Sequence, residues 1–210
     1  MKKVIITGAS SGLGKEIGLI LKEDYEVINI SRNSSEFTDI KCDLSNDKDI
    51  SKAINEIKER HSDFSYIILN SGIMNKALVG EINSDIDKEF KINTTSNIKI
   101  INSLLNTIKT NEADVVIIGS KGSFDPKEGT SVYTSTKHAI NGFIKSLQLE
   151  LKNDKSRVIG IHPGSFDSNL RKSDDTKKRM DPKYIADLIK NFIELPKNME
   201  VSEIVINLKK

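Results

Sequence analysis

The sequence predicts a doubly wound α/β fold, in which helices cover both faces of one parallel sheet. Short runs rich in Val and Ile alternate with longer segments of helical periodicity, and this alternation is typical of repeated β-α-β units. Most of the short runs are continuously apolar, as strands are when both faces of a sheet are covered. The chain has 210 residues and no Pro-rich or Gly/Ser-rich stretch. We therefore expect a single domain over residues 1–210.

Seven runs qualify as strands, and five longer segments qualify as the helices between them. The strand candidates, in chain order, are KVIIT, EVINI, DIKCD, YIILN, DVVIIG, RVIGI and EIVINL. Each helix candidate is long enough to cross from one strand to the next. In such folds ligands bind beyond the carboxyl ends of the strands, so the residues that follow each strand are functional candidates. The helix candidates cover residues 14–22, 49–60, 90–109, 136–152 and 184–194.

The composition is that of an ordinary globular protein. The formal net charge is +2, without the basic excess typical of nucleic-acid binding, so we expect no nucleic-acid partner. Cys42 is the single cysteine, which excludes an internal disulfide, and no Cys and His cluster indicates a metal site. The first ten residues lack the apolar core of a signal peptide, and no segment approaches a membrane span. These features predict a cytoplasmic protein without a membrane partner.

A glycine-rich turn, GASSGLG, joins the first strand candidate to the first helix candidate. Glycines there permit a tight turn and a close approach of the backbone to a pyrophosphate. The free N–H groups and the dipole of a helix N-terminus favour that negative charge. A turn that serves packing alone is the alternative, but the position between strand and helix favours a nucleotide site. The turn residues expected to contact a cofactor are Gly8, Ser10, Ser11, Gly12, Leu13 and Gly14.

A second candidate site is the pair Tyr133 and Lys137 in the stretch SVYTSTKHA. Side chains four residues apart lie on one face of a helix, so the phenol and the ammonium can share one small volume. A free tyrosine has a pKa of about 10, and a positive neighbour lowers it. The spacing alone proves little, because many solvated helices carry such a pair by chance.

The two motifs together resemble the short-chain dehydrogenase/reductase family, and the resemblance covers nearly the whole chain. TGASSGLG is similar to the family's TGxxxGxG element, and YTSTK is similar to its YxxxK. Ser120 precedes Tyr133 by 13 residues, which is similar to the family's spacing. LNSG is similar to the family's NNAG turn, with Leu69 and Ser71 as departures, and HPGSFDS is similar to its PG motif.

The resemblance implies a Rossmann fold, a nicotinamide cofactor and the interconversion of a carbonyl and an alcohol. It implies that Tyr133 is the acid/base and that Lys137 also binds the nicotinamide ribose. It implies that Ser120 holds the substrate oxygen and that Asn93 positions a water linking Lys137 to solvent. Further cofactor contacts implied by the resemblance come from Asp43, Leu44, Asn70, Gly72, Pro163, Gly164, Phe166 and Ser168.

The residues after the second strand candidate predict NADP(H) rather than NAD(H). An acidic side chain there would accept hydrogen bonds from the ribose 2′-hydroxyl, whereas a 2′-phosphate needs a cation and neutral donors. Ser31 and Arg32 stand at this point, and a guanidinium suits a phosphate. Asp43 has two interpretations that the sequence leaves open, namely an adenine contact or the N-cap of the helix that follows it.

The enzyme hypothesis has alternatives of another class. A non-catalytic NADP(H) sensor of the same fold would bind the cofactor without turnover, and a scaffold would bind neither nucleotide. Residues 165–181 fall where the family places a substrate lid, and their basic stretch favours a polar or anionic small-molecule substrate. The family also packs the helices near residues 87–109 and 133–152 against a second copy, which implies a homodimer or homotetramer.

Overall fold

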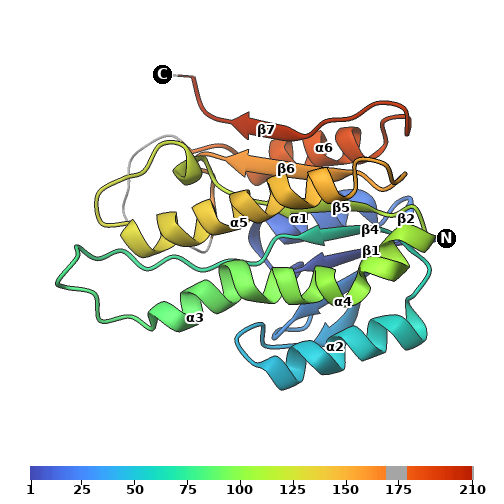
Figure 1. Cartoon of the computed structure of the whole chain (residues 1–210), viewed down its shortest axis with the longest axis horizontal. Coiled ribbons are helices and arrows are strands. Elements are labelled where there is room, and N and C mark those ends of the chain that lie inside the picture. The colour runs from blue at the N-terminus through green and yellow to red at the C-terminus, as the bar shows by residue number, and fades with distance from the viewer. Residues whose placement is uncertain (169–178, 210) are drawn as a thin grey trace.

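The computed structural model describes residues 1–168 and 179–209, and its centre is a parallel sheet. Within these residues the sheet has seven strands in the order β3-β2-β1-β4-β5-β6-β7 (Figure 1). The predicted fold class is therefore confirmed. The strands are β1 (Lys2–Thr7), β2 (Tyr25–Ser31), β3 (Thr38–Lys41), β4 (Phe64–Leu69), β5 (Asp114–Ile118), β6 (Val158–Pro163) and β7 (Glu203–Ile206).

Helices cover both faces of the sheet, and alternate strand residues pack against each layer (Figure 1). In β1, Ile5 belongs to the core beneath α2, α4 and α5, whereas Val4 and Ile6 belong to the core shared with α1 and α6. This two-sided burial explains why the strands read as continuous apolar runs. The helices are α1 (Gly12–Leu21), α2 (Asp47–Arg60), α3 (Ile86–Phe90), α4 (Ser96–Thr110), α5 (Ser131–Glu150) and α6 (Pro182–Ile193).

The strand order reverses between β1 and β4, which fixes the position of the ligand site. From β1 the chain builds β2 and β3 toward one edge, then returns to place β4 on the other side of β1. The register pairs Thr7 with Leu69, so the turns after β1 and β4 leave the sheet side by side. A crevice at the carboxyl ends of these strands is the general binding position in doubly wound sheets.

Two helices differ from the predicted boundaries in ways that matter for the site. Helix α5 begins at Ser131 rather than at residue 136, so Tyr133 and Lys137 lie in one helix. The predicted helix 90–109 begins at Ile86 and contains a π-helical turn, Lys91–Thr95, with Asn93 at its centre. The β-branched and polar residues of this stretch have poor helix propensity. π-Turns inside helices occur frequently at functional sites.

Two absences hold for residues 1–168 and 179–209, the part of the chain that the structure describes. No helix there is both long and apolar enough to cross a membrane. No group of three or more His, Cys, Asp or Glu side chains is arranged to hold a metal ion. Cys42 is buried as a free thiol, and burial raises its pKa to about 12.

Candidate active site

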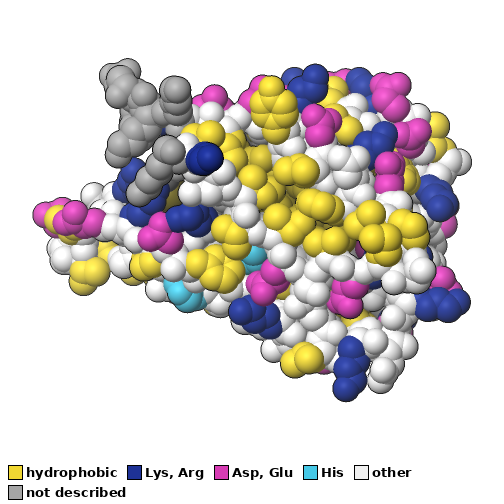
Figure 2. All heavy atoms as spheres, turned by 90° about the horizontal axis from the view of Figure 1, so that it is seen from above, with side chains coloured by type: hydrophobic (Ala, Val, Ile, Leu, Met, Phe, Trp, Pro, Cys, Tyr) yellow, Lys and Arg dark blue, Asp and Glu magenta, His cyan; other side chains and the backbone are white. Residues whose placement is uncertain are grey.

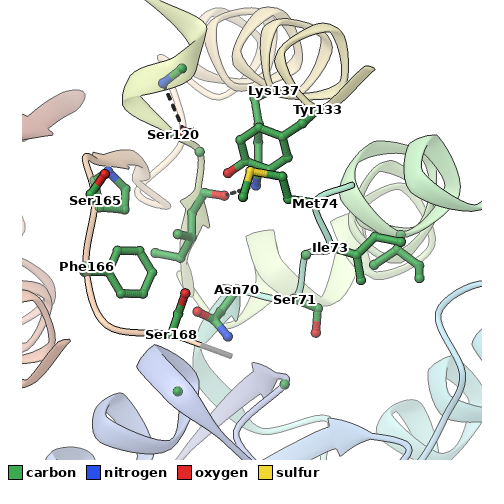
Figure 3. A pocket seen from close by; sticks show the side chains of 18 of the residues that line it. Asn70, Ser71, Ile73, Met74, Ser120, Tyr133, Lys137, Ser165, Phe166 and Ser168 are labelled. Atoms are coloured by element: carbon green, nitrogen blue, oxygen red, sulfur yellow. Dashed lines mark hydrogen bonds between the residues drawn. The ribbon is translucent and has the colours of Figure 1, made fainter. Parts of the chain in front are cut away.

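A cavity of about 810 Å³ lies at the carboxyl ends of the strands, where the reversal of strand order places it (Figure 3). The structure brings nearly all of the predicted site residues to its wall. Three are absent from the wall: Leu13 and Gly14 in the first turn of α1, and Asn93 in the π-turn. The predicted residues that line the cavity are Gly8, Ser10, Ser11, Gly12, Ser31, Arg32, Asp43, Leu44, Asn70, Gly72, Ser120, Tyr133, Lys137, Pro163, Gly164, Phe166 and Ser168.

The glycine-rich turn gives the cavity an anion-binding end. Gly8 has a φ of +78°, which favours glycine. A Cβ atom on Gly14 would lie 2.4 Å from the Gly8 carbonyl oxygen, so glycine there lets the helix pack against the turn. The N-cap Ser11 makes no side-chain capping bond, in contrast to Asn46, which caps α2. The N–H groups at the start of α1 are thus open to a phosphate, while Leu13 is buried in the core.

Thr7 joins the two turns that flank the crevice, although sequence reasoning did not single it out. Its hydroxyl oxygen accepts hydrogen bonds from the backbone N–H groups of Asn70 and Ser71, at 2.9 and 3.1 Å. The Asn70 amide also donates to the Thr7 carbonyl oxygen at 3.1 Å. Thr7 is fully buried at the end of β1. The signal that could have identified it is a polar residue ending an otherwise apolar strand.

Ser31, at the end of β2, and the exposed Arg32 line the wall next to the glycine-rich turn. The Gly8 N–H donates to the Ile30 carbonyl oxygen at 2.9 Å and so holds the turn against β2. The Ser31 hydroxyl donates to the Asn33 carbonyl oxygen at 2.6 Å and accepts from the Asn29 amide at 2.9 Å. Asp39, on the neighbouring strand, accepts hydrogen bonds from Asn29 and Ser35 and does not line the cavity. No acidic residue therefore directly follows β2 at this wall.

Asp43 lines the cavity and is not the N-cap of α2. The N-cap is Asn46, whose side chain accepts from the N–H groups of Lys48 and Asp49. Asp43 accepts instead from the backbone N–H and the hydroxyl of Ser45, at 2.9 and 2.7 Å. Partial burial would raise the pKa of Asp43, but these hydrogen bonds and the charge of Arg32 outweigh it and lower the pKa. The capping interpretation is therefore wrong.

Ser120, Tyr133 and Lys137 converge on the cavity from the end of β5 and the first turns of α5 (Figure 3). The Lys137 Nζ lies 5.8 Å from the centroid of the Tyr133 ring and donates to the Ile118 carbonyl oxygen at 3.0 Å. The Lys137 side chain is buried, and desolvation lowers its pKa to about 8. The Ser120 oxygen accepts from the Gly122 N–H at 3.0 Å, which leaves its own proton to donate into the cavity.

Asn93 lies behind the wall and joins three segments of it. Its Oδ1 accepts from the Ile73 N–H at 2.8 Å. Its Nδ2 donates to the Ile73 carbonyl oxygen at 2.8 Å and to the Thr136 hydroxyl at 3.0 Å. A Cβ atom on Gly72 would lie 3.3 Å from the Asn93 oxygen and 3.7 Å from the Lys137 Nζ. Asn93 and Gly72 therefore fix the backbone beside the Lys137 ammonium.

The predicted lid, 165–181, is described only in part, because residues 169–178 lie outside the described residues. Its two described ends pair with each other through a bridge between Phe166 and Met180. The Met180 N–H donates to the Ser165 carbonyl oxygen at 3.1 Å, and the Asp167 N–H donates to the Met180 carbonyl oxygen at 3.0 Å. Wall residues that sequence reasoning did not single out include Ile73, Met74, Lys76, Lys127, Thr130 and Arg179.

The site thus combines an anion-binding turn at one end with a hydroxyl, a phenol and an ammonium at the other. The turn and the N-terminus of α1 fit a dinucleotide phosphate, because the backbone can approach closely and supplies N–H donors. The Ser120 hydroxyl and the Tyr133 phenol can donate hydrogen bonds to an oxygen of a bound molecule, and the phenol can exchange a proton with that oxygen. Such a constellation suits a nucleotide-dependent change at a carbon–oxygen bond.

Comparison with known proteins agrees with this site. A family model described as short chain dehydrogenase matches residues 2–179, and the chain belongs to this family. A solved structure of a short chain dehydrogenase family protein from Francisella tularensis has a TM-score of 0.88 at 30% identity, with 99% of this chain and 97% of that chain covered. Carbonyl reductase family member 4 of Xenopus laevis is 29% identical in an alignment of 219 positions that covers 93% of this chain and 93% of the relative.

The fold recurs at lower identity as well. An alcohol dehydrogenase from the archaeon Thermococcus sibiricus, solved with 5-hydroxy-NADP, has a TM-score of 0.88 at 20% identity and is covered over 96% of its length. The match spans 98% of the present chain. The protein is therefore an oxidoreductase of the short-chain dehydrogenase family.

Proposed function

We propose that the protein is an NADP(H)-dependent oxidoreductase that interconverts a carbonyl and an alcohol on a small molecule. The observation that carries this proposal is the convergence of Ser120, Tyr133 and Lys137 on the cavity that also contains the glycine-rich turn. The similarity to a carbonyl reductase family member supports the same reaction class. A sensor would need the nucleotide-binding turn but no proton donor, so the intact polar group favours an enzyme.

In the direction of reduction, Tyr133 donates its phenolic proton to the alkoxide that develops on the substrate oxygen. The nicotinamide cofactor, when bound, supplies the hydride to the carbonyl carbon. Ser120 donates a hydrogen bond to the same oxygen, which stabilises its growing negative charge. The Lys137 ammonium favours the phenolate that remains on Tyr133, and proton uptake from solvent restores the phenol. Asn93 orders the backbone around Lys137 and is proposed to hold a water in this proton path.

The test of the proposed function is NADPH oxidation against a panel of aldehydes and ketones. Turnover of at least one member, lost in Tyr133→Phe, is the expected outcome. NADPH binding without turnover of any member would favour the sensor, and binding of neither nucleotide would favour a scaffold.

Cofactor choice provides a separate prediction. Because β2 ends at Ser31 and is followed by Arg32 rather than by an acidic residue, NADPH should bind at least about tenfold more tightly than NADH. Arg32→Asp should reverse this order, since a carboxylate repels the 2′-phosphate and accepts from a 2′-hydroxyl. Fluorescence titration measures both affinities. Arg60→Asp, which alters an exposed arginine away from the cavity, is the matched control. Equal affinities in the unaltered protein would contradict the assignment.

The protein is also expected to form a homodimer or homotetramer. The segment 86–110 and α5 lie side by side on one face of the sheet (Figure 1), where a second copy could cover them. A band of apolar side chains crosses the upper side of the molecule, which Figure 2 shows. On the segment that contains β7, Met199 and Val205 are half exposed. Sedimentation velocity at micromolar concentration should show a species of two or four chains. A monomer throughout this range would refute the expectation.

A further inference from the structure

Arg179 stands in the wall of the active-site cavity with its charge poorly compensated. Only 12% of its side chain is exposed, and its Nη2 is buried without a hydrogen-bond partner in the described part of the chain. Its Nη1 lies 3.8 Å from an oxygen of Asp167, whose own side chain is 70% exposed. An ion pair of this length with a solvated carboxylate contributes little. Arg179 therefore places a largely buried and weakly paired guanidinium in the cavity wall, which is a costly arrangement unless an anion compensates the charge.

The backbone holds Arg179 beside the substrate end of the cavity. Arg179 precedes Met180, which is bridged to Phe166 and hydrogen-bonded to Ser165 and Asp167. Phe166 and Ser165 face the same space as Ser120 and Tyr133 in Figure 3. The guanidinium therefore belongs to a segment of the wall that is held by hydrogen bonds. This segment faces the same space as Ser120 and Tyr133.

Two further cations stand on the wall on other segments. Lys76 follows β4, and Lys127 precedes α5; the Ala77 N–H donates to the Gly129 carbonyl oxygen at 3.0 Å and so joins their loops. Within the described residues neither lysine forms an ion pair, whereas Lys121 pairs with Asp125. Several Lys and Arg side chains lie close together at the left of Figure 2, the end toward which the strands point. The cavity wall therefore carries cations on three separate segments, and two of these cations have no ion pair within the described residues.

We propose that the substrate carries an anionic group, a carboxylate or a phosphate, besides its reacting carbonyl, and that Arg179 binds this group. The proposal rests on the proposed function and specifies its substrate class. A planar guanidinium presents paired donors that match either anion, and the exposed lysines add long-range attraction. Binding of the anion at Arg179 orients the rest of the substrate toward Ser120 and Tyr133.

The experiment compares matched substrates that differ only in charge. 4-Carboxybenzaldehyde and methyl 4-formylbenzoate share the ring and the aldehyde, and 4-formylphenyl phosphate replaces the carboxylate with a phosphate. The acid or the phosphate should have a kcat/KM about 10- to 100-fold above that of the ester, the scale of a hydrogen bond between charged groups. The ratio of acid to phosphate identifies which anion the site prefers. An ester reduced as efficiently as both anions overturns the proposal while leaving the proposed function intact.

A binding measurement makes the result independent of turnover. 4-(Hydroxymethyl)benzoate and its methyl ester are titrated calorimetrically into the protein with and without NADPH. The acid should bind at least about tenfold more tightly than its ester, which is the lower end of the same scale. If no aldehyde is reduced, the proposed function fails. Equal binding of the acid and the ester would overturn the proposal that Arg179 binds an anionic group of the substrate.

Variants assign the effect to Arg179. Arg179→Gln should abolish the preference for the anion, because both the positive charge and the paired guanidinium donors are lost. Arg179→Lys should retain part of the preference for the anion. This variant tests the proposal even if Arg179→Gln does not fold. Arg60→Gln, an exposed arginine away from the cavity, should change nothing. A tenfold loss of NADPH affinity in Arg179→Gln with an unchanged preference would mean that Arg179 binds cofactor phosphate, which overturns the proposal.

Discussion

Tyr133→Phe is expected to lower kcat by roughly 10²- to 10⁴-fold, the usual effect of removing a general acid. The substitution removes only the hydroxyl, and the ring that lies beside the Lys137 ammonium remains. NADPH affinity should therefore stay within about threefold of the unaltered protein, because the turn at Gly8 and the N-terminus of α1 are untouched. Steady-state NADPH oxidation with any substrate from the carbonyl panel measures the first quantity, and fluorescence titration measures the second.

The control for this variant is Tyr184→Phe. Tyr184 is 70% exposed on α6 and does not line the cavity, so its hydroxyl should make no difference to turnover. If Tyr133→Phe reduces a substrate at the rate of the unaltered protein, Tyr133 is not the acid and the interpretation of the Tyr133–Lys137 pair is wrong.

Local patterns predicted the fold, and together with the family resemblance they predicted somewhat less than half of the residues that line the cavity. Continuous apolar strands alternating with periodic segments were enough to predict a parallel sheet, because two-sided burial acts on every strand residue alike. The glycine-rich turn and the spacing of Tyr133 and Lys137 were informative because each lies within one element and obeys its geometry. Residues that follow a strand reach the wall for a similarly simple reason, since all parallel strands end at the same edge.

The parts that could not be predicted depend on which hydrogen bonds form and which side chains become buried in the folded chain. Asp43 and Asn46 are equally good capping residues in the sequence, and only the bond from Ser45 assigns Asp43 to the turn. The bond that joins Asn93 to Thr136 crosses 43 positions. Arg179 reads as one cation of a basic stretch, and only its burial beside the Phe166 bridge distinguishes it. A local hydrogen bond decided the first case, a long-range hydrogen bond the second, and burial the third.

Lys137→Met is expected to separate function from stability. Loss of the ammonium should weaken NADPH binding and lower turnover, because Lys137 is proposed both to contact the nicotinamide ribose and to favour the phenolate of Tyr133. Any residual activity should be greatest at low pH, where solvent supplies the proton more readily. Titration with NADPH and a pH profile of kcat test these effects. Lys58→Met, on the exposed face of α2, is the control and should alter neither quantity.

The same variant should be more stable than the unaltered protein when no nucleotide is bound. Burial lowers the pKa of Lys137 from 10.5 to about 8, so a charge at this position costs on the order of 3 kcal/mol relative to the unfolded chain. Losing the hydrogen bond to the Ile118 carbonyl oxygen offsets about 1 kcal/mol of this, which leaves a net gain of roughly 2 kcal/mol. Urea denaturation at pH 7 measures the difference.

The pH dependence of that difference identifies its origin. Below pH 8 the lysine is charged in both the folded and the unfolded chain, and the full cost of the buried charge is present. Between pH 8 and 10.5 the unfolded chain holds a proton that the folded protein has released, so the unaltered protein gains stability as the pH rises. The advantage of Lys137→Met should therefore be largest below pH 8 and should be lost before pH 10.5, because the variant still lacks the hydrogen bond to the Ile118 carbonyl oxygen. A difference that stays constant across this range would show that the Lys137 ammonium is not destabilised by burial.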